Sequence, residues 1–299
     1  MALSGILNID KPAGWTSFDV VRFVRGRCGE RRVGHAGTLD PAATGVLPVL
    51  LGQATRLTEY LVDATKAYEA QVELGLETDT YDMEGDVVAR TDASLVAREA
   101  IEAMLDRFRG EFLQTPPAYS ALKRDGVPLY KRARRGEQVE LEPRPARVDE
   151  LYITSLDLPR AGLHVECAKG FYVRSLAHDL GAALGVGGTL AGLQRSRVGL
   201  FHVADAVSID DLRAAFEAGD WQRYVHAPDE VLLHWNAAIL RPEGATRLRN
   251  GQVLRIEMGE ERQPAVDSLC RAYTTAGDFI GIARVSDSTT LKAEKVFAG

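Results

Sequence analysis

The sequence predicts an α+β body built on a mixed, largely antiparallel sheet flanked by helices, followed by a small β-barrel-like module. Helical and strand-like patterns follow one another over most of the chain without the regular alternation of a doubly wound fold. After Asp229, short strand-like runs separated by glycine turns fill roughly 60–70 residues. The chain has 299 residues, which at about 150 residues per domain suggests two domains. We place the boundary between residues 232 and 233.

The N-terminal residues predict a strand followed by a helix. Residues 6–9 form a short apolar run that ends in the turn-forming sequence Asp-Lys-Pro. Thr16 and Ser17 are candidate N-caps for a helix that continues to about Arg27. Its expected stripe contains Phe18, Val21 and Val24 or Arg25.

The next elements alternate between loops and regular structure. Residues 29–47 are rich in Gly, Pro and Thr and predict an extended loop, whereas residues 54–61 predict a helix. Between residues 68 and 74, apolar side chains alternate with polar ones, which is typical of a half-buried strand. Residues 78–86 are acidic and predict a loop. Residues 95–108 predict a helix because Ile101, Leu105 and Phe108 recur at helical spacing.

The last elements of the body and the C-terminal module follow the same reasoning. Residues 163–167 alternate as a strand, and residues 174–184 predict a helix. Ser208 and Asp211 have the spacing of a capping box for a helix that ends near Ala218. The runs that predict strands in the C-terminal module are 252–256, 269–273 and 279–285.

Charge is unevenly distributed along the chain. The net charge of −6 argues mildly against a polyanionic partner. Residues 22–32, however, contain five Arg and one Glu, and residues 123–135 contain six basic residues and one Asp. Residues 77–106 contain nine acidic residues and two Arg. Acidic and basic surfaces are therefore expected to be separate, and a nucleic-acid partner stays open.

The cysteines and the apolar segments indicate a cytoplasmic protein. Cys28, Cys167 and Cys270 are odd in number and far apart, which suits a reducing compartment. The first residues lack the charged start and apolar centre of a signal peptide. The apolar stretch at residues 46–51 is far too short to cross a membrane.

Several common enzyme motifs do not occur. The sequence contains no GxxxxGK[ST] phosphate loop, no HExxH zinc motif and no GxSxG nucleophile elbow. The glycines at residues 185–188 lack the other parts of a dinucleotide fingerprint. The six His residues show no metal-ligand spacing. We therefore assign neither a metal nor a cofactor.

The segment Gly34-His35-Ala36-Gly37-Thr38-Leu39-Asp40-Pro41 is the most unusual part of the sequence. Its glycines and proline fix the path of the backbone around one carboxylate, Asp40. An Asp before Pro is most often a simple turn former. The alternative is a carboxylate held rigidly in a cleft, where it acts as a nucleophile. An aspartyl phosphotransferase is a third interpretation, although Ala42 stands where a second acid is usual.

These residues belong to a longer pattern of motifs that extends over nearly the whole chain. The motifs are GILNIDKPAGWTSFDVV (5–21), RVGHAGTLDPAATGVLPVLLGQATR (32–56), KAYEAQVELGLETDTYDMEG (66–85), TPPAYSALKRDGVPLYKRARRG (115–136), CAKGFYVRSLAHDLG (167–181), LRNGQVL (248–254) and FIGIARV (279–285). With these motifs in this order, the chain resembles the bacterial tRNA pseudouridine-55 synthases, the TruB family.

The resemblance implies a pseudouridine synthase fold over residues 1–232, with an RNA-binding insertion around residues 115–150. Residues 233–299 would form an RNA-binding PUA-like domain. The implied activity is isomerisation of uridine to pseudouridine at position 55 in the T-arm of tRNA. Such an isomerisation needs no redox step, and the family implies no cofactor, no membrane and no obligate protein partner. We expect a monomer.

The resemblance also assigns roles to individual residues. Asp40 corresponds to the catalytic aspartate, and every route open to it, attack on the sugar, attack on the ring or removal of a sugar proton, needs an ionised carboxylate. Arg174 corresponds to the arginine that pairs with this carboxylate. The residues that correspond to contacts of the target nucleotide are His35, Tyr68, Tyr172 and Leu193. Gln194 departs from the family, which usually has a second basic residue there.

Weaker assignments concern RNA outside the target base. Asp82 corresponds to a residue near the displaced bases. The candidates for phosphate contacts are Lys11, Arg31, Arg32, Lys123, Arg124, Lys131, Arg132, Arg134 and Arg135. Each residue also has a simpler interpretation: the basic runs as solvated faces, Tyr68 as a core residue, His35 as a hydrogen-bonding loop residue and Arg174 as an exposed arginine.

Two other functions stay open at this point. A guide-RNA-dependent pseudouridine synthase would need RNA and protein partners, whereas residues 66–150 look bacterial-like. A tRNA-folding chaperone could act in addition to catalysis, because gripping the arm already requires opening it.

Overall fold

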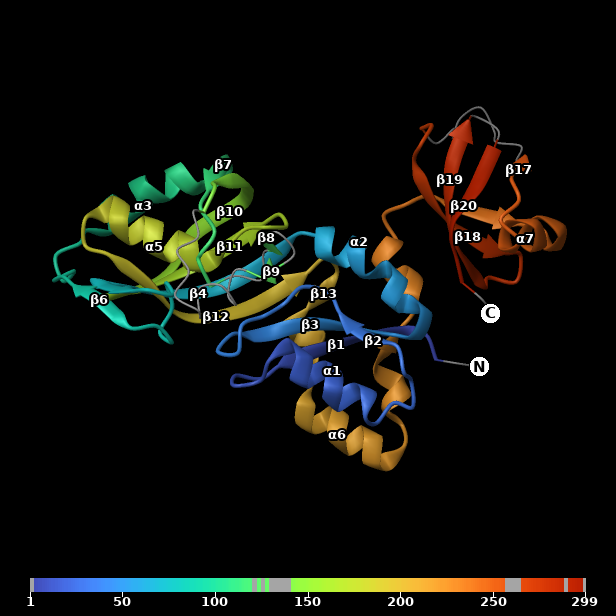
Figure 1. Ribbon diagram of the computed structural model, residues 1–299, viewed down its shortest axis with the longest axis horizontal. Coiled ribbons are helices and arrows are strands. Elements are labelled where there is room, and N and C mark those ends of the chain that lie inside the picture. The colour runs from blue at the N-terminus through green and yellow to red at the C-terminus, as the bar shows by residue number, and fades with distance from the viewer. Residues whose placement is uncertain are drawn as a thin grey trace.

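The computed structural model describes residues 3–119, 123–124, 127–128, 141–255, 265–287 and 290–297. A large sheet with helices forms the body, and a second, smaller sheet forms the C-terminal module (Figure 1). No helix in the described ranges combines the length and the apolar character that a membrane crossing requires.

The large sheet has the order β14-β1-β3-β12-β4-β11-β10-β7, with β2, β13 and β15 paired to its members. Two of its pairings, β1 with β14 and β3 with β12, are parallel, and the others are antiparallel. The α+β class with a mixed, largely antiparallel sheet is therefore confirmed. Its strands are β1 (Gly5–Lys11), β2 (Val33–His35), β3 (Thr44–Leu51), β4 (Lys66–Leu74), β7 (Gly110–Gln114), β10 (Arg144–Asp157), β11 (Arg160–Cys167), β12 (Gly188–Val198), β13 (Phe201–His202), β14 (Val207–Ser208) and β15 (Val225–His226).

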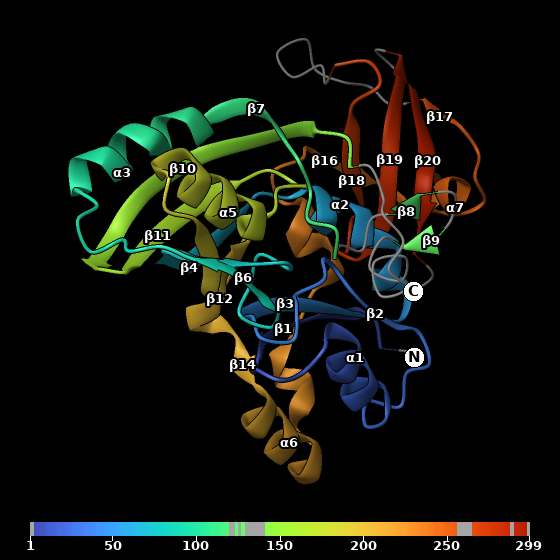
Figure 2. The same ribbon diagram turned by 60° about the vertical axis from the view of Figure 1, so that its left-hand side comes forward.

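Helices cover the large sheet in two groups. Figures 1 and 2 show α3 and α5 over β10, β11 and β4, whereas α1 and α6 lie beside β1 and β3. Small hairpins pair β5 (Leu76–Thr78) with β6 (Val87–Arg90) and β8 (Lys123–Arg124) with β9 (Val127–Pro128). The helices of the body are α1 (Ser17–Arg25), α2 (Thr58–Asp63), α3 (Arg98–Leu105), α5 (Val173–Leu184) and α6 (Ile209–Ala218), with 3-10 turns η1 (Gly52–Leu57), η2 (Asp106–Phe108), η3 (Val203–Asp205), η4 (Trp221–Tyr224) and η5 (Pro228–Leu232).

Strand β4 shows how the sequence pattern produces the central core. Tyr68, Ala70, Val72 and Leu74 are buried in one apolar cluster with residues of α3 and α5. The alternate residues, among them Glu69, point to the opposite face, because successive side chains of a strand lie on opposite sides of the sheet. The predicted half-buried strand is thus confirmed.

Helix α1 begins as predicted but buries a different stripe. The Thr16 side chain accepts a hydrogen bond from the backbone N–H of Asp19, and the Asp19 carboxylate accepts one from the backbone N–H of Thr16, which makes a full capping box. Phe18 is 57% exposed, however, so the predicted stripe was wrong there. The residues that pack on the sheet are Val20, Val21, Phe23 and Val24.

The C-terminal module is a five-stranded sheet of order β16-β18-β19-β20-β17. It also contains a helix, α7 (Pro242–Arg249), that the prediction of an all-β module missed. Only Ala245 and Leu248 of this polar helix are buried, so its apolar pattern is too sparse to be noticed. Its strands are β16 (Ala237–Leu240), β17 (Leu254–Arg255), β18 (Leu269–Thr274), β19 (Phe279–Asp287) and β20 (Thr290–Val296).

The structure gives the limits of the expected insertion and of the C-terminal module. Strand β10 begins at Arg144, so residues 144–150 of the expected insertion belong to the central sheet instead. The expected domain boundary at residue 232 coincides with the end of η5, and the first strand of the C-terminal sheet begins at Ala237. The module packs against the body, because Ile282 and Phe297 share an apolar cluster with residues of η1 and α2.

Candidate active site

A cavity of about 290 Å³ lies where the loop after β2 meets β4, β12 and the N-terminal end of α5. Five of the six residues expected to act on the target nucleotide line this cavity. They are Asp40, Tyr68, Tyr172, Arg174 and Leu193. Asp40 is 28 residues from Tyr68 and 134 residues from Arg174 in the sequence, so the fold alone brings these side chains together.

Arg174 lies between two carboxylates at the start of α5. One terminal nitrogen lies 3.2 Å from Oδ2 of Asp40, and the other lies 3.3 Å from Oδ2 of Asp82. It also donates a hydrogen bond of 2.9 Å to the carbonyl of Tyr119. The Arg174 side chain is only 10% exposed, whereas Asp40 is 45% exposed. The guanidinium is therefore a buried counter-ion behind a carboxylate that stays accessible from the cavity.

The loop that carries Asp40 is fixed by buried polar groups. The Lys11 ammonium donates hydrogen bonds to the carbonyls of Pro12, Trp15 and Pro41 at 2.9, 2.6 and 3.1 Å. The Ser17 hydroxyl accepts from the backbone N–H of Leu39 at 2.9 Å. The bonds to Pro41 and Leu39 join the N-terminal segment to the two residues directly beside Asp40.

The structure corrects the expectation that Lys11 contacts phosphate. Its side chain has no exposed surface. Burial lowers the pKa of Lys11 from 10.5 to about 8, and the nearby Asp40 carboxylate partly opposes this shift. In this structure Lys11 anchors the Asp40 loop.

Tyr68 is both a core residue and a wall of the cavity. Its side chain belongs to the same apolar cluster as Leu39 and Ala43, and the residue is 9% exposed. Burial raises the pKa of its hydroxyl above the usual value of 10.0. In the sheet Tyr68 faces Val165 of β11 on one side and Arg195 of β12 on the other.

Two buried cations of the cavity were not found from the sequence. Arg195 is 1% exposed and lies beside Tyr68. Lys66 is 7% exposed, its ammonium donates to the carbonyls of Val62 and Ala64, and burial lowers its pKa to about 8. The β12 sequence around Arg195 gives no alternating pattern because register shifts interrupt the strand on both sides of Leu193, so no local signal marks this arginine as buried.

His35 does not line the cavity. It lies on β2 opposite Val49 of β3. Its ring hydrogen-bonds to the backbone of Gly37, and its Nδ1 atom is buried without a partner among the described residues. Burial, aided by the charge of Arg195, lowers the pKa of His35 below 6.5, so the imidazole is neutral at neutral pH.

Of the remaining basic candidates, the structure describes the side chains of Arg31 and Arg32 only, and neither lines the cavity. Arg31 and Arg32 are exposed in the loop after α1. Lys123 and Arg124 form β8, but their side chains are not described. The other basic candidates of this segment, Lys131, Arg132, Arg134 and Arg135, lie outside the described residues.

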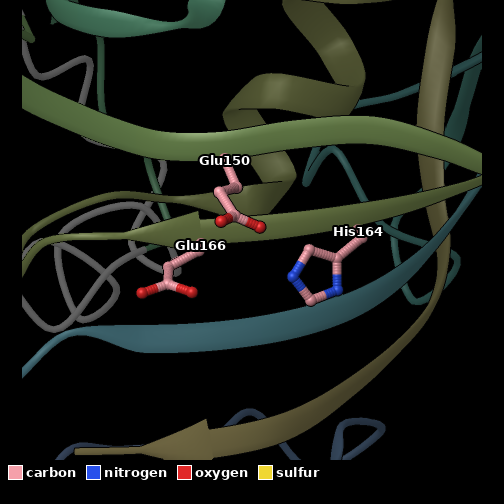
Figure 3. Close-up of side chains that lie close together, drawn as sticks. All are labelled: Glu150, His164 and Glu166. Atoms are coloured by element: carbon pink, nitrogen blue, oxygen red, sulfur yellow. The ribbon is translucent and has the colours of Figure 1, made fainter.

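The opposite side of the same strands carries a different group of side chains. We call it the outer face, defined by Glu69, Glu150, His164, Glu166 and Arg197, and we call the side of Tyr68 and Arg195 the pocket face. Figure 3 shows Glu150, His164 and Glu166 close together on neighbouring strands, with ligand-type atoms within 4.8 Å of one another. Nδ1 of His164 lies 2.6 Å from Glu69, and Arg197 lies 2.5 Å from Glu166. Of the three residues in Figure 3, His164 and Glu166 therefore already have partners.

Comparison with solved structures supports the fold. The chain is similar to a protein in the crystal structure of a Cbf5-Nop10-Gar1 complex, with a TM-score of 0.74, 25% identity, and coverage of 98% of this chain and 85% of that one. A crystal structure of the archaeal box H/ACA sRNP Nop10-Cbf5 complex gives a TM-score of 0.71 at 25% identity, with coverage of 98% and 86%.

Comparison with curated sequences and family models identifies the family. The "tRNA pseudouridine synthase B" of Dehalococcoides mccartyi strain 195 is 41% identical over 99% of this chain and 97% of its own length. That of Stutzerimonas stutzeri strain A1501 is also 41% identical, over 95% and 92%. The model of the TruB family pseudouridylate synthase N-terminal domain matches residues 25–173. Models of the tRNA pseudouridylate synthase B C-terminal domain and of the pseudouridine synthase II TruB C-terminal region match residues 174–239 and 237–297. A site built around Asp40 and Arg174, a matching fold and these relatives together show that the chain belongs to the TruB family of pseudouridylate synthases, which are isomerases.

Proposed function

We propose that this enzyme isomerises uridine to pseudouridine at position 55 in the T-arm of tRNA, with Asp40 as the catalytic group. Relatives at 41% identity that are named tRNA pseudouridine synthase B support tRNA as the substrate. The single observation that carries the proposal is the meeting of Asp40, Tyr68 and Arg174 in one cavity. Neither the sequence order nor any local pattern would place these three side chains together.

The geometry suits breaking and remaking a glycosidic bond. Asp40 is accessible from the cavity, whereas Arg174 behind it is nearly buried and holds one carboxylate oxygen. An ionised carboxylate so placed can attack the anomeric carbon, attack the ring or remove a sugar proton, and the three routes stay open. The Arg174 guanidinium, 3.2 Å from Oδ2 of Asp40, is placed to hold the carboxylate in one orientation.

We further propose that the target base leaves the RNA stack and enters the cavity. A base within a folded arm is out of reach of a buried pocket unless it is flipped out. The cavity volume of about 290 Å³ is near the lower end of the range of about 300–1,000 Å³ for small-ligand sites. The Tyr68 ring can replace part of the lost stacking, which is worth about 1–3 kcal/mol per base on an aromatic side chain.

The test compares two carboxylates that share the same arginine. Asp40→Asn should lower the rate of pseudouridine formation on tRNA by at least about 1,000-fold and leave the Kd for tRNA within about threefold, because only the reacting group changes. Asp82→Asn is the matched control, and we expect it to keep turnover within about tenfold. Normal turnover by Asp40→Asn would contradict the role of Asp40.

The same assay separates a stand-alone enzyme from a guide-dependent one. The solved structures that resemble this chain contain the additional proteins Nop10 and Gar1, whereas the more similar relatives are named as tRNA enzymes. We propose a cytoplasmic monomer that needs no protein partner. Turnover on a bare tRNA transcript by the purified chain supports this, and turnover only after addition of a guide RNA and partner proteins would contradict it.

A chaperone activity in addition to catalysis is separable by the same variant. Opening the T-arm does not require the chemistry of Asp40, so Asp40→Asn should retain any ability to anneal misfolded tRNA. If annealing is lost together with the carboxylate, no separate folding activity exists.

A further inference from the structure

Arg195 is a buried guanidinium that the proposed chemistry does not use. Its Nε donates a hydrogen bond of 2.7 Å to the carbonyl of Val46, and one terminal nitrogen donates one of 3.1 Å to the carbonyl of Gly37. A third hydrogen bond joins it to the side chain of Tyr68. Within the described residues no carboxylate pairs with Arg195. Burying an unpaired charge costs folding free energy. A buried arginine at this position therefore points to a role beyond packing.

The contacts of Arg195 explain two glycines that surround Asp40. Gly37 has a φ of +87°, and a Cβ atom there would lie 3.4 Å from a terminal nitrogen of Arg195. Gly45 has a φ of +97°, and a Cβ atom there would lie 2.3 Å from the backbone oxygen of Arg195. Because Gly45 has no Cβ atom, β3 and β12 can approach closely enough to pair at Gly45 and Arg195. The backbone before Asp40 therefore passes close to the Arg195 side chain, and the backbone after it passes close to the Arg195 main chain.

One side chain thus connects both walls of the cavity. On one side it holds the Gly37 turn, three residues before Asp40, and on the other it holds Tyr68. Arg195 is itself only 1% exposed, so its main contribution to the cavity acts through the groups that it binds. A displacement of about 1 Å in a reacting group can cost roughly 100-fold in rate.

We propose that Arg195 is a positioning residue that fixes the Tyr68 ring and the Asp40 loop relative to each other. The target base then meets the aromatic face and the carboxylate in one geometry. This inference rests on the proposed function, because it concerns the same cavity and the same reaction.

The first experiment compares two arginines of β12 that lie on opposite faces of the sheet. Arg195→Met should lower kcat on tRNA by about 100-fold and change KM by less than about threefold, because RNA binding outside the cavity is untouched. Arg195→Lys keeps the charge and part of the donor set and should recover part of the loss. Arg197→Met is the matched control, since it removes an arginine two residues away that pairs with Glu166 on the outer face. It should leave both parameters within about twofold.

A double-mutant cycle separates positioning from a merely structural role. Tyr68→Phe keeps the ring but removes the hydroxyl that Arg195 binds, so its effect on kcat should overlap with that of Arg195→Lys and not multiply with it. Loss of stability alone would lower the Tm and leave the kcat of the folded fraction unchanged. If Arg195→Met does not fold, the kcat of Arg195→Lys and the coupling measured in the double-mutant cycle still test the positioning role.

The possible failures are distinguishable. No pseudouridine from the wild-type chain on any tRNA would contradict the proposed function. Wild-type turnover together with normal kcat in folded Arg195→Met or Arg195→Lys, or fully multiplicative effects in the cycle, would overturn the positioning role alone.

Discussion

The two faces of the same strands carry opposite chemistry. On the pocket face, the cations Arg174, Arg195 and Lys66 line the same cavity as Asp40, and Arg174 lies 3.2 Å from its carboxylate. On the outer face, Glu69, Glu150 and Glu166 lie around His164, and Arg197 pairs with Glu166. Neighbouring residues such as Tyr68 and Glu69 belong to different faces because side chains alternate along a strand.

This difference shows why net charge is a poor guide to the partner of this chain. The sum of −6 averages over a cation-lined cavity and an acidic surface on the reverse of the same sheet. A polyanion responds to local potential, which falls off over about 8 Å at physiological salt. RNA is therefore expected to approach the pocket face, and changes on the two faces should have unequal effects.

Among the changes that compare the two faces, the largest effect should come from removing the counter-ion of the pocket. Arg174→Met leaves the carboxylates of Asp40 and Asp82 without the guanidinium that lies 3.2 and 3.3 Å away. Without the guanidinium the Asp40 carboxylate is no longer held in place, and a displacement of about 1 Å can cost roughly 100-fold in rate, so we expect kcat/KM to fall by about 100-fold. Steady-state kinetics on tRNA measure the change.

The matched substitution on the outer face is Arg160→Met. Arg160 pairs with Glu73 at 2.9 Å, but its side chain is 67% exposed. Exposed pairs contribute little, so kcat/KM should stay within about twofold. Equal losses of kcat/KM in Arg174→Met and Arg160→Met would contradict the view that only the pocket face takes part in the reaction.

A smaller effect should appear in the pH dependence of stability. Lys66 has a pKa of about 8 in the folded chain and 10.5 as the ordinary value. Below pH 8 both states hold the proton, whereas between about pH 8 and 10.5 only the unfolded state holds it. The free energy of unfolding therefore rises with pH in that window, by at most about 1.4 kcal/mol per pH unit.

Urea unfolding at several pH values measures this effect. The difference between the wild type and Lys66→Met should grow from pH 7.5 to pH 9.5 in favour of the wild type. Gln71→Met, an exposed position of the same strand that changes no ionisable group, is the control. A difference that stays constant or shrinks with pH would mean that the Lys66 ammonium is not buried as described.

The smallest effect is expected on the outer face itself. Glu150→Gln removes one negative charge from an exposed residue of the group around His164. Because solvent screens this charge from the cavity, kcat and KM for tRNA should each change by less than about twofold at physiological salt. A tenfold change in either parameter would assign the outer face a part in RNA binding or catalysis.

Much of the fold and most of the site could be predicted from the sequence. The alternation in β4 and β11 and the caps of α1 and α6 are local signals, and the structure confirms these elements. Asp40 stood out because glycines and a proline surround it. Its partners were found only through the resemblance to a family, since Tyr68 reads as a core residue and Arg174 as an exposed one.

The parts that could not be predicted depend on contacts between distant segments. Strand β12 was not assigned, because its register shifts break the period of two on which strand prediction depends. Arg195 and Lys11 look like surface residues in the sequence and are buried only because backbone carbonyls from other segments receive their hydrogen bonds.

The position of β12 also has a consequence for biosynthesis. This strand lies between β3 and β4 and joins the two halves of the large sheet, yet it is made more than a hundred residues after both. While the ribosome extends the chain, the segments bearing Asp40 and Tyr68 emerge well before the strand that joins them in the sheet. Only when residue 198 has left the exit tunnel can the missing strand insert between them, and domains in general fold as such units. The nascent protein is thus expected to acquire its working pocket late and in one step.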